Sequence, residues 1–98
     1  MKEEAKDVAR KVQKYKLLLD SLEETRNPEN RCMICKDIYK NFIDILYDCQ
    51  KLGYPSSKIQ QIETVLKLRI EKTNIDNVER YILEIKKQYE DLIRGLMQ

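Results

Sequence analysis

The chain has 98 residues, of which 42% are hydrophobic and 37% charged, and its formal net charge at pH 7 is +2. Such a length supports one domain, predicted over residues 1–98, and such a small charge excludes a protein that coats nucleic acid through a broad basic face. Histidine is absent, which removes the commonest general base and metal ligand, so we expect a protein that is not an enzyme.

Nothing in the sequence is typical of a membrane or secreted protein. No apolar run approaches the roughly 20 residues that cross a bilayer, and the first residues, MKEEAKD, lack the apolar stretch of a secretory signal. The three cysteines are an odd number and do not form a disulfide framework. We therefore expect a cytoplasmic protein that does not contact membranes.

The first predicted helix covers residues 3–24. Its apolar residues recur at spacings of three and four, which is typical of an amphipathic helix with a heptad seam. The seam consists of Ala5, Val8, Val12, Tyr15, Leu19 and Leu22. After it, Asn27 can cap a new helix, Pro28 presets φ for a first turn, and Glu29 suits the positive helix end. These signals predict a second helix over residues 28–52.

The second predicted helix has the same kind of seam and further apolar residues outside it. The seam consists of Cys35, Ile38, Phe42, Ile45, Cys49 and Leu52. The apolar residues outside the seam are Ile34, Tyr39, Ile43, Leu46 and Tyr47. Because a helix that is apolar on most sides is buried on most sides, we predict that this helix is central or carries a partner interface.

A sharp corner follows the second helix. Gly53 can adopt the left-handed conformation that ends a helix, Tyr54 can pack back on it, and Pro55 prevents continuation. Ser57 and Gln60 have the spacing of a capping box, which predicts a third helix over residues 57–72. Its inward apolar seam consists of Ile59, Ile62, Leu66 and Ile70.

The boundary between the last two helices is weaker because it contains neither glycine nor proline. Asn74 and Asp76 are good capping residues, and the apolar seam slips in phase at this point. We therefore predict a break here rather than one continuous helix, and a fourth helix over residues 75–97. Its seam consists of Ile75, Val78, Ile82, Ile85, Tyr89, Leu92 and Leu96.

Four such seams joined by short connections predict an all-α fold, an antiparallel four-helix bundle. Heptad spacing favours helices that cross near 20°. The alternative is a pair of longer helical hairpins that complete their core only by dimerisation.

The corner resembles the helix-turn-helix of bacterial and archaeal DNA-binding repressors when it is aligned on Gly53. Ile59 and Ile62 take the two apolar positions of the recognition helix, whereas Asp48 departs from the motif, which has an apolar residue there. The resemblance implies a dimeric DNA-binding regulator that uses residues 45–70. Its implied DNA contacts are Ser57, Lys58, Gln60, Gln61, Thr64 and Arg69. The alternative is an ordinary αα-hairpin, which needs the same glycine and apolar pattern for packing alone.

The second helix also carries a CxxC motif, Cys32 to Cys35. Two thiolates at this spacing can supply half of a tetrahedral zinc site, so a complete site needs one pair from each of two chains. This arrangement resembles the zinc hook that joins coiled-coil hairpins in DNA-repair ATPases. Alternatives are a redox-active or disulfide-forming pair, and cysteines that pack as small apolar residues.

Apolar residues beyond the needs of the seams suggest a surface for a partner. The predicted interface residues are Tyr39, Ile43, Tyr47, Tyr81 and Leu83. Tyrosines outside a core are common anchors of protein interfaces, although a wider core would also account for these residues. We therefore predict a non-catalytic helical protein without a required cofactor, which binds another protein or forms a homodimer through apolar helix faces.

Overall fold

The computed structural model describes residues 2–96, with side chains over residues 5–95. It consists of α1 (Lys2–Glu24), α2 (Pro28–Lys51), α3 (Ser56–Lys72) and α4 (Val78–Leu96), and the described part of the chain has no strand. This confirms the prediction of an all-α bundle. No helix among the described residues has the length and apolar character needed to cross a membrane.

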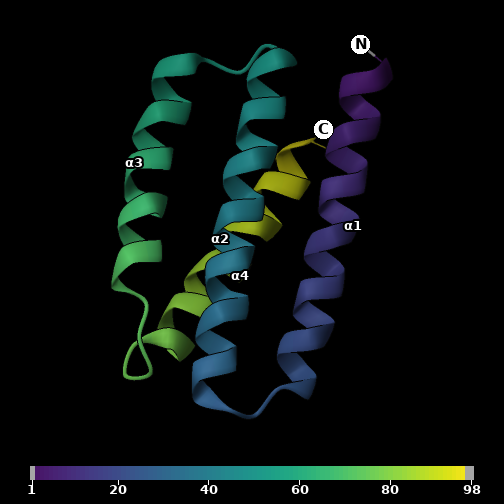
Figure 1. The fold of residues 1–98 in the computed structure, drawn as a ribbon. Coiled ribbons are helices and arrows are strands. Elements are labelled where there is room, and N and C mark those ends of the chain that lie inside the picture. The colour runs from purple at the N-terminus through teal and green to yellow at the C-terminus, as the bar shows by residue number, and fades with distance from the viewer. Residues whose placement is uncertain (1, 97–98) are drawn as a thin grey trace.

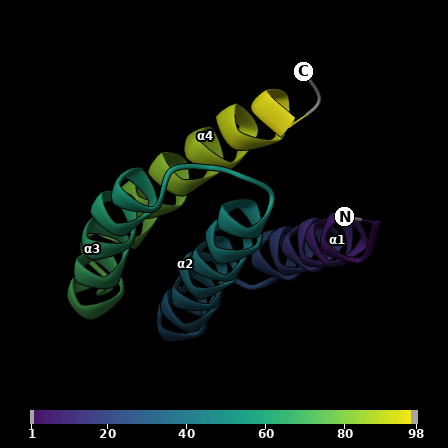
Figure 2. The ribbon, with the colours of Figure 1, turned by 90° about the horizontal axis from the view of Figure 1, so that it is seen from above.

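The helices are arranged around α2. Figure 1 shows α1 and α3 on either side of α2 as antiparallel neighbours, and α2 packs against each of the other three helices. This confirms α2 as the central helix. Helix α4 lies on one face of the other three and crosses them obliquely, which Figure 2 shows from above. The near-parallel crossing expected from the heptad seams therefore does not extend to α4.

Aromatic contacts near the start of α4 and past its middle are consistent with its slant. Near the start of α4, the Tyr81 ring lies under the guanidinium of Arg69 on α3, 4.9 Å from the ring centre. Further along, the Tyr89 ring stacks on Tyr15 of α1, with ring centres 3.5 Å apart. Phe42 of α2 meets the same Tyr89 ring edge-on at 4.8 Å. Helix α4 therefore leaves α3 and approaches α1 along its length.

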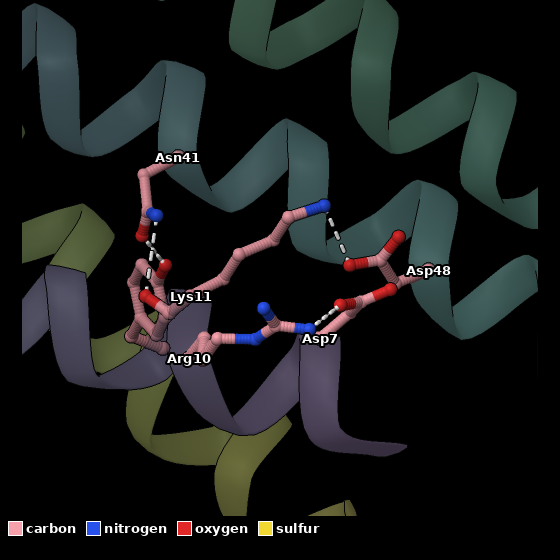
Figure 3. Close-up of polar contacts among 6 residues, drawn as sticks. Asp7, Arg10, Lys11, Asn41 and Asp48 are labelled. Atoms are coloured by element: carbon pink, nitrogen blue, oxygen red, sulfur yellow. Dashed lines mark hydrogen bonds and ion pairs between the residues drawn. The ribbon is translucent and has the colours of Figure 1, made fainter. Parts of the chain in front are cut away.

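Two polar residues of α2 are buried where α2 meets α1. Asn41 donates from its side-chain nitrogen to the carbonyl oxygen of Lys11 at 3.2 Å, and its side-chain oxygen accepts a hydrogen bond from the Tyr89 hydroxyl. Two turns further along α2, the Asp48 carboxylate lies 2.6 Å from the Lys11 ammonium, as Figure 3 shows. Buried polar groups are costly unless paired, so these contacts favour one register between α1 and α2.

The ends of α2 follow the local signals in the sequence. The Asn27 side chain accepts a hydrogen bond from the Asn30 N–H at 3.1 Å, and Pro28 occupies the first turn. At the other end, Gly53 has a φ of 110°. The Gly53 N–H donates to the Gln50 carbonyl at 3.1 Å and the Tyr54 N–H donates to the Cys49 carbonyl at 3.1 Å. These two bonds form a Schellman motif, which confirms the predicted stop.

The predicted capping box at Ser57 and Gln60 is wrong. Helix α3 begins at Ser56, and its N-cap is Pro55, whose side chain accepts no hydrogen bond. Ser57 therefore lies inside the first turn, where its side chain cannot cap the helix. The Ser56 hydroxyl instead accepts a hydrogen bond from Gln50 of α2 at 2.9 Å.

The break between α3 and α4 is confirmed, but α4 begins three residues later than predicted. Asn74 accepts hydrogen bonds from the N–H groups of Asp76 and Asn77, at 2.9 and 3.1 Å. This turn occupies residues 75–77, so Ile75 is 59% exposed and not part of the core. The predicted end of the fourth helix at Met97 lies outside the described residues.

Arg31 joins three helices at one end of the bundle. Its guanidinium donates to the carbonyl oxygens of Leu22 and Thr25 at the end of α1, at 2.6 and 2.8 Å. It also donates twice to the Glu79 carboxylate in the first turn of α4, at 2.8 and 2.7 Å. The hydrogen bond from Arg31 lowers the pKa of Glu79 below its usual value.

We expect Arg31→Ala to lower the free energy of unfolding by about 2 kcal/mol, because it removes charge-assisted hydrogen bonds to Glu79 and to the carbonyls of Leu22 and Thr25. Exposed Arg26 nearby supplies the control, and Arg26→Ala should change stability by less than about 0.5 kcal/mol. Urea unfolding followed by circular dichroism measures both.

The stabilising contact with Glu79 is complete above the carboxyl's ordinary pKa and is lost as the pH falls through its lowered value. The difference in the free energy of unfolding between the wild type and Arg31→Ala should therefore shrink in acid. Equal losses of stability in Arg31→Ala and Arg26→Ala would contradict the role of Arg31.

Three core tyrosines resist ionisation. Burial, helped by the negative charge of Glu90, raises the pKa of Tyr15 to about 12. Burial also raises the pKa of Tyr39 and of Tyr89 above the ordinary value. In the unfolded chain these hydroxyls ionise near pH 10, before they do so in the folded protein.

Stability should consequently be unaffected by these tyrosines below about pH 10 and should fall between about pH 10 and 12, because only the unfolded state releases the protons there. Urea unfolding at a series of alkaline pH values measures this decline. Tyrosinate absorbance provides a second readout, since the titration of the folded protein should lag behind that of the chain in urea. Coincident titrations would contradict the prediction.

Candidate functional site

An apolar groove between α3 and α4, floored by α2, is the candidate functional site. Its volume is about 420 Å³. Its apolar lining consists of Phe42, Leu46, Cys49, Tyr54, Pro55, Ile59, Ile62 and Leu92. Lys58 of α3 and Gln88 and Asp91 of α4 supply the polar part of its walls. A concave apolar site with a few polar groups at its edge is suited to binding rather than to acid–base chemistry.

The oblique course of α4 creates this groove. Figures 1 and 2 show α4 leaving α3 as it crosses toward α1, so the two helices are close at one end and apart at the other. At the narrow end, Arg69 of α3 lies 3.2 Å from Glu84 of α4. At the wide end, α3 begins at the corner after Gly53. Only Ile59 and Leu66 of α3 are fully buried, so α3 has few contacts that would draw it onto α4.

The charges of the groove are unevenly compensated. Asp91 lies 3.6 Å from Arg94 on the same helix. Lys58, in contrast, has no ion pair with any residue that the structure describes. It lies in the first turn of α3, where Pro55 provides no side-chain cap for the free backbone N–H groups. The α3 side of the open end therefore combines an unpaired ammonium with the positive end of a helix.

The structure corrects the predicted interface. Tyr39, Ile43 and Tyr81 are buried, with exposures of 1%, 8% and 3%. The Tyr39 hydroxyl donates to the backbone carbonyl of Tyr81 at 3.0 Å, so both belong to a core that is wider than the seams. Tyr47 and Leu83 remain exposed, at 44% and 68%, but neither lines the groove. Tyr47 forms a hydrogen bond with Glu63 that lowers the pKa of this carboxyl.

The corner after α2 is an αα-hairpin. Helices α2 and α3 lie side by side and antiparallel (Figure 1), whereas the two helices of a helix-turn-helix cross at about 90–120°. The geometry expected from the repressor resemblance is therefore absent. Arg69 is engaged by Glu84 and Tyr81. The other predicted DNA contacts are exposed along α3: Ser57, Lys58, Gln60, Gln61 and Thr64.

The CxxC pair does not form a surface site for metal. Because α2 begins at Pro28, Cys32 and Cys35 lie beyond the free N–H groups of its first turn. Cys35 has no exposed surface, and burial raises its pKa to about 12. Within the described residues, no three His, Cys, Asp or Glu side chains are placed to hold a metal ion. A zinc ion or disulfide shared between two chains would require Cys35 to leave the core.

Comparison with protein families, characterised proteins and solved structures finds no match, so function has to be inferred from the groove itself. The sequence places Phe42 and Cys49 in the seam of the second helix, Leu46 outside that seam, and Ile59 and Ile62 on the inward face of the third helix. It shows that they are apolar, but not that α4 leaves them partly uncovered. The one local signal was Pro55, which both starts α3 without a side-chain cap and lines the open end of the groove.

We expect only one of the three thiols to react readily with Ellman's reagent in the folded protein. Cys32 is half-buried, while Cys35 and Cys49 are buried, and burial raises the pKa of all three. Cys32→Ser should therefore remove the reaction seen without denaturant, and the other two thiols should react only in urea. Ready reaction of two or more thiols in the folded protein would contradict this placement.

Proposed function

We propose that this protein is a non-catalytic binding protein of the cytoplasm, and that its groove receives an amphipathic α-helix of a partner protein. The observation that carries the proposal is the apolar groove between α3 and α4, which remains accessible in the folded chain. The free thiols Cys32, Cys35 and Cys49 suit a reducing compartment.

The dimensions of the groove favour a helix as its occupant. The α3 wall runs from Pro55 to Ile62, roughly 10 Å at 1.5 Å per residue, which corresponds to about two helical turns. The groove has helices as its floor and walls, and an added helix would complete the packing that α3 and α4 leave open. Such a partner would present apolar residues at i, i+3, i+4 and i+7.

A second copy of the chain is the competing occupant. The sequence predicts a homodimer, and α3 presents two exposed apolar residues, Val65 and Leu68, outside the groove lining. Against this, α3 also carries Lys58, Lys67 and Lys72. Two α3 helices brought together would place like charges in proximity.

A designed helical peptide tests the proposal. The probe is a fluorescein-labelled peptide of about 15 residues with leucine at i, i+3, i+4 and i+7 and with alanine and glutamine elsewhere. Fluorescence anisotropy should give a Kd in the micromolar range. Tyr54→Ala and Ile62→Gln, which alter the lining, should weaken binding by about tenfold. Tyr47→Ala and Leu83→Asp alter exposed residues outside the groove and should leave the Kd unchanged.

Folding and self-association are checked on the same samples. Tyr54 is 40% exposed, so Tyr54→Ala should leave the protein folded. This variant therefore tests the groove even if Ile62→Gln lowers the free energy of unfolding. Circular dichroism reports the fold, and sedimentation equilibrium reports the oligomeric state. Absence of peptide binding, or equal weakening by the variants outside the groove, would overturn the proposal. A wild-type dimer that Tyr54→Ala converts to monomer would show that a second copy occupies the groove instead.

A further inference from the structure

The groove lining has one charged residue without an ion pair among the described residues. This residue lies at one end of the groove, so the two ends differ in charge. Lys58 lines the open end, where α3 starts, and forms no ion pair with the described residues. The acidic residue of the groove lining, Asp91, differs because it has Arg94 at 3.6 Å. The groove lining therefore has, at its open end, a lysine whose charge is not paired by any described residue.

We infer that the partner helix carries a carboxylate beside its apolar stripe, and that this carboxylate docks against Lys58 at the open end of the groove. The partner is thus an acidic amphipathic helix. This inference rests on the proposed function, and it adds the charge of the partner and the end of the groove where that charge lies.

Two features of the structure favour a carboxylate at this position. The Lys58 ammonium can form a charge-assisted hydrogen bond with it. In addition, the N-cap of α3 is Pro55, so the N–H groups of the first turn have no side-chain acceptor, and a negative charge near this helix end is stabilised. Asp91 on the opposite wall opposes a second negative charge, but its pairing with Arg94 reduces that effect.

Three designed peptides test the inference. They share one apolar stripe and differ at a single flanking position, which is glutamate, glutamine or lysine. With the wild-type protein at low salt, the glutamate peptide should bind about three- to tenfold more tightly than the glutamine peptide, and the lysine peptide more weakly than either. The difference should shrink as salt is added, because Lys58 is exposed.

Charge reversal at two lysines of α3 separates local docking from overall charge. Lys58→Glu should reverse the order, so that the lysine peptide binds most tightly. Lys67→Glu makes the same change in net charge on the same helix, at a residue that does not line the groove and pairs with Glu63 at 3.3 Å. It should leave the order as in the wild type.

The outcomes distinguish this inference from the proposed function. Reversal by Lys58→Glu alone supports the docked carboxylate. Equal shifts in both lysine variants, or equal affinities of the three peptides for the wild-type protein, would overturn it. If the three peptides bind the wild-type protein with equal affinity, and Tyr54→Ala weakens binding of the glutamine peptide, the proposal of a helix-binding groove still stands. Failure of all three peptides to bind would overturn both.

Discussion

The packing of α2 against three helices at once is the constraint on which the rest of the structure depends. From Cys35 through Cys49, its seam residues and its additional apolar residues are buried together, except for Tyr47. Helices α1 and α3 each pack on α2 and lie on opposite sides of it, as Figure 1 shows. The position of every other helix is therefore set mainly by what it contacts on α2, and α4 covers the face that remains.

Polar contacts decide how α1 and α4 lie on α2. Apolar seams with heptad spacing tolerate a shift by one repeat, whereas a buried amide or carboxylate does not. Asn41 bonds to Lys11 of α1 and Tyr89 of α4, and Asp48 pairs with Lys11. Leaving Asp48 buried without its ammonium would cost several kcal/mol. These two residues thus select one arrangement among several that apolar packing alone would accept.

Local signals in the sequence predicted the helices well, because caps and stops act within a few residues. Asn27, Gly53 and Asn74 each form the hydrogen bonds or the backbone conformation expected of them. The groove was not predictable in this way. A seam shows which face of a helix is buried, but not against which neighbour, and the slant of α4 depends on contacts such as Tyr15 with Tyr89. For the same reason, residues assigned to a free surface proved to be buried.

The contact of Arg31 with Glu79 has a consequence for how the chain folds. The two residues are 48 positions apart, yet the same guanidinium closes the last turn of α1. One side chain of α2 therefore holds both the end of the first helix and the first turn of the fourth. Such a link ties the first hairpin to the last helix, which favours their melting together rather than one at a time.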